Sequence, residues 1–74
     1  MSEDYSKFKH ISTEEVEADL RETREEKADY EVELDVLNKR PAENKVRIYM
    51  LTGRVLEHDK LIDFLTELLE YRNE

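Results

Sequence analysis

The sequence predicts an all-α fold, a two-helix antiparallel hairpin that self-associates into a four-helix bundle. Three observations favour this fold. A heptad of mostly apolar residues runs from position 48 to position 69 and continues through Gly53. Pro41 stands where a second helix would begin, a position at which its missing N–H costs nothing. The two helices defined in this way have similar lengths, roughly 39 and 46 Å at about 1.5 Å per residue.

The first helix has a clear N-terminal signal. Ser12 is the expected N-cap, and Glu15 stands three residues later, which is the spacing of a capping box. Ile11 and Val16 are placed as a hydrophobic staple around this cap. A helix is therefore predicted over residues 13–38.

The apolar spacing of the first helix forms a seam at steps of four and three, although two of its members are polar. The seam residues are Val16, Leu20, Thr23, Lys27, Tyr30, Leu34 and Leu37. A turn at residues 39–40 and a second helix over residues 41–72 complete the hairpin. Residues 1–11 are expected to be a flexible lead-in. The chain thus forms a single helical domain over residues 12–74.

Residues 30–51 also allow a second interpretation, an α+β fold of order α-β-β-α. Strands would lie near residues 30–37 and 45–51, since apolar and polar residues alternate in both and β-branched and aromatic residues are frequent. The acids of the first strand would face the cations of the second, which would help to fix the register. A helix capped by Thr52 would follow. We favour the helical hairpin because the heptad and the position of Pro41 both agree with it.

The second helix carries more apolar surface than one neighbouring helix can cover. In the segment LIDFLTELLEY (residues 61–71) the apolar side chains take about half of the helix circumference. A chain of 74 residues without cysteine has a small core and no disulfide to support it. We therefore expect a homodimer with twofold symmetry. The expected oligomer interface is the heptad Ile48, Leu51, Val55, His58, Ile62, Leu65 and Leu69.

The charges are divided along the chain. The formal net charge is −8 at pH 7. Residues 12–35 hold eleven acids and three cations, whereas residues 38–56 hold five cations and one acid. The net negative charge argues against general affinity for nucleic acid or anionic lipid. The candidate contacts for a partner or for nucleic acid are Lys39, Arg40, Lys45 and Arg47.

The sequence contains no pattern typical of a catalytic or cofactor site. We find no calcium loop, glycine-rich phosphate loop, nucleophile elbow or zinc motif. His58 falls on the apolar seam, but the residue three positions before it is Val55 and not the Glu of a di-metal bundle. His10 precedes the helix cap and is expected to be solvated. We therefore expect neither an enzyme nor a metal or cofactor site.

The function expected from the sequence is that of a small, non-enzymatic interaction module, an adaptor, regulator or inhibitor of another protein. The apolar second helix would mediate assembly, and the acidic first helix or the basic tip, residues 38–47, would give specificity and a fast on-rate. The alternative is a nucleic-acid-linked role, in which the basic tip contacts phosphates or the acidic helix mimics DNA. The N-terminus MSEDYSKFKH lacks a signal-peptide core, and no segment reaches the roughly 20 apolar residues of a membrane span. The cytoplasm is the expected location.

Overall fold

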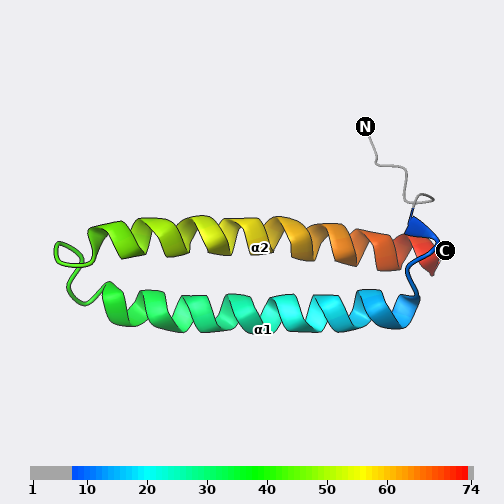
Figure 1. Cartoon of the computed structure of the whole chain (residues 1–74), viewed down its shortest axis with the longest axis horizontal. Helices are drawn as coiled ribbons and strands as arrows, with labels where there is room; N and C mark the ends of the chain where they lie inside the picture. Colours follow the sequence, from blue (N-terminus) through cyan, green and yellow to red (C-terminus); the bar gives the residue numbers. More distant parts are fainter. Residues whose placement is uncertain (1–7, 74) are drawn as a thin grey trace.

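Two antiparallel helices make up most of the chain. The computed structural model describes residues 8–73. Helix α1 covers Thr13–Leu37 and helix α2 covers Lys45–Arg72, and the two lie side by side along their length (Figure 1). The predicted all-α helical hairpin is confirmed. Between residues 8 and 73 there is no strand, so the α-β-β-α alternative is wrong.

Residues 30–37, where apolar and polar residues alternate as in a strand, lie in α1. The helix carries their apolar side chains on more than one side. Leu34 is half-buried, whereas Val32 and Val36 are 65% and 59% exposed. A buried strand face would have covered all three residues, because side chains two positions apart lie on the same face of a strand. The half-buried positions instead follow the helical steps of the predicted seam.

Helix α1 begins where the sequence predicts. Ser12 is the N-cap, with φ −69° and ψ 154°, and its Oγ accepts a hydrogen bond from the backbone N–H of Glu15 at 3.1 Å. Among the described residues the reciprocal bond of a full capping box, from the Ser12 N–H to the Glu15 carboxylate, is not formed. Ile11 packs against the buried cluster that includes Val16, in agreement with the predicted staple.

Every residue of the predicted α1 seam is buried or half-buried. Its two polar members are accommodated by specific bonds. Thr23 is only 5% exposed, and its Oγ1 donates to the carbonyl oxygen of Asp19 at 2.7 Å. Lys27 reaches across to α2, where its Nζ lies 2.5 Å from Oδ1 of Asp59. These polar residues therefore lie in the interface with their polar atoms satisfied.

The connection between the helices is longer than the predicted turn at residues 39–40. It runs over residues 38–44, and α2 begins at Lys45, four residues after the start predicted at Pro41. The proline ring disfavours helical backbone at Arg40 and cannot donate a backbone hydrogen bond, so the chain turns here. This corrects the prediction that Pro41 occupies the first position of the second helix.

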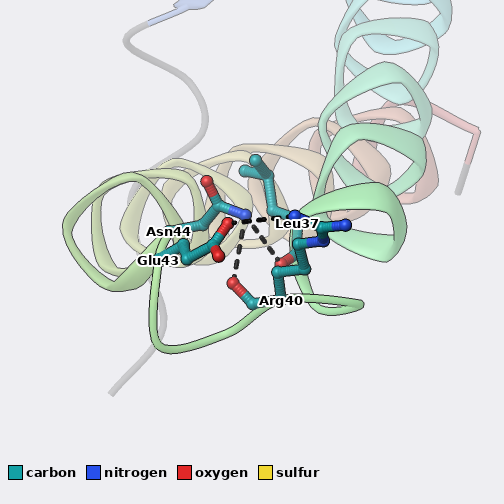
Figure 2. A network of polar contacts seen from close by, with 4 residues as sticks. All are labelled: Leu37, Arg40, Glu43 and Asn44. Atoms are coloured by element: carbon teal, nitrogen blue, oxygen red, sulfur yellow. Dashed lines mark hydrogen bonds and ion pairs between the residues drawn. The ribbon is translucent and has the colours of Figure 1, made fainter.

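Asn44 stabilises this turn with its side-chain amide. Nδ2 donates to the carbonyl oxygens of Leu37, at 3.2 Å, and Arg40, at 3.1 Å (Figure 2). The backbone of Asn44, with φ −113° and ψ 18°, is not helical, and its side chain forms no cap bond to α2. The side-chain amide of Asn44 therefore bonds the end of α1 and the turn and does not cap α2, which begins at the next residue.

The main core lies at the open end of the hairpin, away from the turn. Its buried residues are Val16, Leu20, Leu65 and Leu68. Phe8 and Ile11, from the segment before α1, pack against this cluster. They supply a second neighbour for the wide apolar face predicted over residues 61–71. The lead-in predicted over residues 1–11 is therefore packed from residue 8 onward, and residues 1–7 lie outside the described part of the chain.

Arg72 joins the two ends of the described chain. Its Nη2 donates to the carbonyl oxygen of Phe8 at 2.6 Å, and its Nη1 donates to Oγ1 of Thr13 at 3.4 Å. The ring of Phe8 meets the ring of Phe64 edge-on, with centroids 5.2 Å apart and an interplanar angle of 76°. This arrangement holds the segment before α1 against the last turns of α2 (Figure 1).

Candidate interaction surface

The predicted oligomer interface lies on the side of α2 that is turned toward α1. Two of its seven residues, Leu51 and Leu65, are buried at 1% and 6% exposure. The half-buried members are Ile48, Val55, His58, Ile62 and Leu69. A large part of this face is thus already used inside one hairpin. Its participation in contacts with a second copy stays a prediction.

His58 makes its contacts within the hairpin. Its Nδ1 lies 2.8 Å from the carbonyl oxygen of Arg54, and its Nε2 lies 3.7 Å from Oε1 of Glu26. Its ring meets the ring of Tyr30 edge-on, with centroids 5.3 Å apart. His10 is exposed, as predicted. Over residues 8–73, no group of three or more His, Asp or Glu side chains could hold a metal ion.

Two of the four cations predicted as partner or nucleic-acid contacts form ion pairs within the chain. Nη2 and Nε of Arg47 lie 2.9 and 3.0 Å from Oε2 of Glu33. Nη1 of Arg40 lies 3.6 Å from Oε2 of Glu43, with both side chains largely in solvent. The two lysines of the set are exposed. The tip therefore offers less unpaired positive charge than the sequence suggests.

The most conspicuous surface feature is a set of large apolar side chains that the hairpin does not cover. Their exposure ranges from 44% to 82%. They are Val32, Val36, Val46, Tyr49, Met50, Leu56, Leu61 and Tyr71. None of them belongs to the heptad predicted as the oligomer interface, although Leu61 and Tyr71 lie within the wide apolar face predicted over residues 61–71. The signal was present, because positions 46, 49, 50 and 56 are apolar and fall outside the heptad.

These exposed residues are concentrated in one half of the molecule. Six of the eight lie between residues 32 and 56, in the half next to the turn. We call these six the turn-side patch: Val32, Val36, Val46, Tyr49, Met50 and Leu56. Leu51 is the one buried apolar residue of that half within the described chain. The open end has Phe8 and Ile11 as additional cover, and the turn-side patch has no such cover from residues 8–73.

The comparisons with family models, with curated proteins and with solved structures give no match. Within residues 8–73, neither helix is long and apolar enough to cross a membrane.

Proposed function

We propose that this chain is a non-enzymatic interaction module that acts as a homo-oligomer and binds another protein, as an adaptor, regulator or inhibitor in the cytoplasm. Two hairpins would associate into an assembly of four helices. The observation that carries this proposal is the turn-side patch, where six large apolar side chains are each at least 48% exposed. Large apolar side chains exposed in one region of a small protein are typical of sites where proteins bind one another.

Self-association would compensate for the small core of the single hairpin. Only five apolar side chains are buried among the described residues. In a chain of this size one core rarely supplies more than about 3–5 kcal/mol of stability. Each Å² of apolar surface that a second copy covers contributes about 25 cal/mol. A closed dimer with twofold symmetry is the commonest way to bury such a surface.

The acids of α1 would give the module its specificity. Ten of the eleven acids in residues 12–35 are exposed, and all of these except Glu26, which lies beside His58, can face a partner. A concentrated negative charge accelerates encounter with a basic partner and repels acidic ones. Apolar contact would then hold the complex together, since exposed ion pairs add little affinity. An enzymatic role has less support, because the hollow beside Leu20, Ala28 and Leu69 is open to solvent and not enclosed.

The first test is the mass of the protein in solution, measured by sedimentation equilibrium over a wide range of concentration. We expect twice the 8.9 kDa of one chain. Leu65→Asp should dissociate the assembly and unfold much of the chain, because Leu65 is 6% exposed in the core. A wild-type protein that stays monomeric and unfolds cooperatively at every concentration would contradict self-association, as would a soluble, folded, monomeric Leu65→Asp variant.

The second test identifies the partner by affinity capture of the tagged protein from lysate at two salt concentrations, with proteins and nucleic acids both analysed. One stoichiometric protein partner would support the proposal. Nucleic acid alone, lost at the higher salt, would overturn it in favour of phosphate contact through the basic tip. A variant with Lys39→Glu and Lys45→Glu is the matched control, since both lysines are exposed. It should lose nucleic acid and retain the protein partner.

A further inference from the structure

Six acids of α1 lie on one side of the helix. They follow each other at steps of four and three, so they form a row beside the seam that packs on α2. They are Glu15, Asp19, Glu22, Glu26, Asp29 and Glu33, and we call them the acidic flank. The cations between residues 12 and 35 stand at other positions of the helix: Arg21, Arg24 and Lys27. Most of the net negative charge of α1 is therefore concentrated on this flank.

The adjoining side of α2 is apolar near the open end of the hairpin. Positions 47, 50, 54, 57, 61, 64, 68 and 71 follow each other at steps of three and four, so they form one row along α2. The last four members of the row, which we call the open-end face, are Leu61, Phe64, Leu68 and Tyr71. At the other end of the row, Arg47 forms an ion pair with Glu33 of the acidic flank. The acidic flank and this row of α2 therefore border the same side of the hairpin.

Two acids stand beside the open-end face without an ion-pair partner. Leu20 packs with Leu65 and Leu68 in the buried cluster, so the stretch of α1 around Leu20 lies next to the open-end face. Asp19 and Glu22 belong to this stretch and are exposed. Within residues 8–73, neither carboxylate forms an ion pair. An apolar surface with unpaired negative charge along one edge is complementary to a partner that is apolar and basic.

The segment before α1 shows which chemistry the open-end face accepts. Phe8 and Ile11 pack on the buried cluster, and the ring of Phe8 meets the ring of Phe64 edge-on. Lys9 and His10 stand between these two apolar residues and are exposed. The chain's own occupant of the face thus combines two apolar anchors with a positive charge.

This segment covers only the middle of the open-end face. Leu61 and Tyr71, at the two ends of the face, are 44% and 45% exposed. Phe8 contacts Phe64, which lies between them in the row. A helix that packed along the whole face would therefore have to take the place of Phe8. Such a helix would cover apolar surface that the segment before α1 leaves in solvent.

We propose that the open-end face binds a basic amphipathic helix of another protein, which displaces Phe8. The apolar side of that helix packs on the face, and its Lys or Arg side chains reach Asp19 and Glu22. This inference rests on the proposed function and names the surface and the class of partner. A second copy is a poorer occupant, because it carries a net charge of −8 itself. The turn-side patch, toward the other end of the hairpin, stays available for self-association.

The first test measures the binding of a labelled synthetic helix, with leucine at heptad spacing and lysine elsewhere, by fluorescence anisotropy. Leu61→Gln should raise the dissociation constant at least about fivefold, because it removes an apolar contact at one end of the face. Leu56→Gln is the matched control, since Leu56 is also an exposed leucine of α2, at 57%, but lies outside the row. It should change the dissociation constant little. A peptide with glutamate in place of lysine should bind at least about tenfold more weakly.

The second test compares two pairs of acids on α1. Asp19→Asn combined with Glu22→Gln removes two charges from the acidic flank, and we expect the dissociation constant of the leucine–lysine peptide to rise at least about threefold. Glu17→Gln combined with Glu25→Gln removes two charges from exposed positions outside the flank. Both double variants have the same net charge. A site on the acidic flank therefore predicts a clearly smaller effect for the second pair.

The third test asks whether the peptide takes the place of Phe8. The amide of Ile11 donates to the carbonyl oxygen of Phe8 at 3.0 Å, and saturating peptide should make hydrogen exchange at this amide faster. Phe8→Ala should lower the dissociation constant of the peptide at least about threefold, because the competing side chain is gone. Slower or unchanged exchange at Ile11, or weaker binding to Phe8→Ala, would overturn the displacement.

The outcomes separate this inference from the proposed function. Binding that Leu61→Gln and the first acid pair weaken, and their controls do not, supports the inference. No binding of the leucine–lysine peptide, or equal effects of both acid pairs, overturns it, since only general charge attraction would then remain. A wild-type dimer that Leu61→Gln dissociates also overturns it, in favour of a second copy on this face. In each of these cases the mass in solution and the partner captured from lysate still decide the proposed function.

Discussion

Lys27 of α1 and Asp59 of α2 form an ion pair across the hairpin, with Nζ 2.5 Å from Oδ1. The lysine occupies a seam position at which an apolar residue would be usual, and its side chain is 28% exposed. Its aliphatic part lies along the interface while the amine reaches the carboxylate at the edge. The hydrogen bond to Asp59 is the largest cause of a raised pKa of Lys27, and the charges of Asp59, Glu31 and Asp63 act in the same direction.

The raised pKa of Lys27 predicts a loss of stability at alkaline pH. In the unfolded chain the amine titrates near 10.5, and in the hairpin it titrates above that value. The stabilising effect of the protonated amine is therefore complete below pH 10.5 and disappears as the pH rises through the folded pKa. We expect the urea midpoint of Lys27→Met to lie below that of the wild type by a constant amount from neutral pH to about 10, with the difference shrinking above it.

The control for this prediction is Lys39→Met, since Lys39 is an exposed residue of the turn. Its urea midpoint should differ little from that of the wild type at any pH. The prediction is wrong if the difference in urea midpoint between Lys27→Met and the wild type stays unchanged well above pH 10.5. The ion pair would then contribute nothing to stability, and the difference would come from packing of the side chain alone.

Asn44 provides a test in which the sign of the effect is informative. At an ordinary N-cap, Asp and Asn are about equally good, and a negative charge there is favoured by the helix dipole. Here Nδ2 donates to the carbonyl oxygens of Leu37 and Arg40. Asn44→Asp removes both donors and places a carboxylate oxygen near these carbonyls, so the free energy of unfolding should fall by about 1–2 kcal/mol.

Thermal unfolding of Asn44→Asp and Ser12→Ala, followed by circular dichroism, would check this prediction. Ser12→Ala removes a true N-cap bond and should cost about 1 kcal/mol, which calibrates the measurement. An Asn44→Asp variant that is as stable as the wild type, or more stable, would contradict this prediction. It would mean that Asn44 acts as an N-cap of α2 and that its hydrogen bonds to Leu37 and Arg40 do not stabilise the turn.

The packing of Phe8 predicts that the segment before α1 contributes to stability. Phe8→Ala removes the edge-to-face contact with Phe64 and uncovers part of the core, so the free energy of unfolding should fall by about 1–2 kcal/mol. Hydrogen exchange at the amide of Ile11, which donates to the carbonyl oxygen of Phe8 at 3.0 Å, should become faster. His10→Ala, at an exposed position of the same segment, should change neither quantity.

Two leucines of α2 test where the core lies. Leu68 is 1% exposed, and Leu68→Ala should cost about 2–5 kcal/mol because it leaves a cavity in the main cluster. Leu61 is 44% exposed, and Leu61→Ala should cost less than about 1 kcal/mol. Urea unfolding of both variants at one protein concentration measures the difference. If Leu68→Ala and Leu61→Ala lowered the free energy of unfolding by the same amount, the main core would not lie around Leu68 at the open end.

The sequence by itself determined the two helices and the seam between them, because the signals for both are local. The Ser12 cap fixes the start of α1 through one side-chain bond to a residue three positions away. The steps of three and four bring the seam of α1 and the heptad of α2 onto one face of each helix, whatever lies opposite. Even the polar Thr23 is satisfied locally, by the carbonyl of Asp19 one turn earlier.

Only the tertiary structure decided where α2 begins and which apolar residues find a neighbour. Pro41 suits a helix start by its own geometry, but the bonds from Asn44 to Leu37 and Arg40 form only when the chain turns back on itself. Phe8 likewise contacts Phe64 only because the ends of the described chain meet at the open end. Phe8 and Phe64 are distant in sequence, and the bonds of Asn44 depend on the path of the turn, so a periodic pattern of apolar residues predicts neither contact. The exposure of the turn-side patch likewise depends on how the two helices pack, which the sequence pattern does not specify.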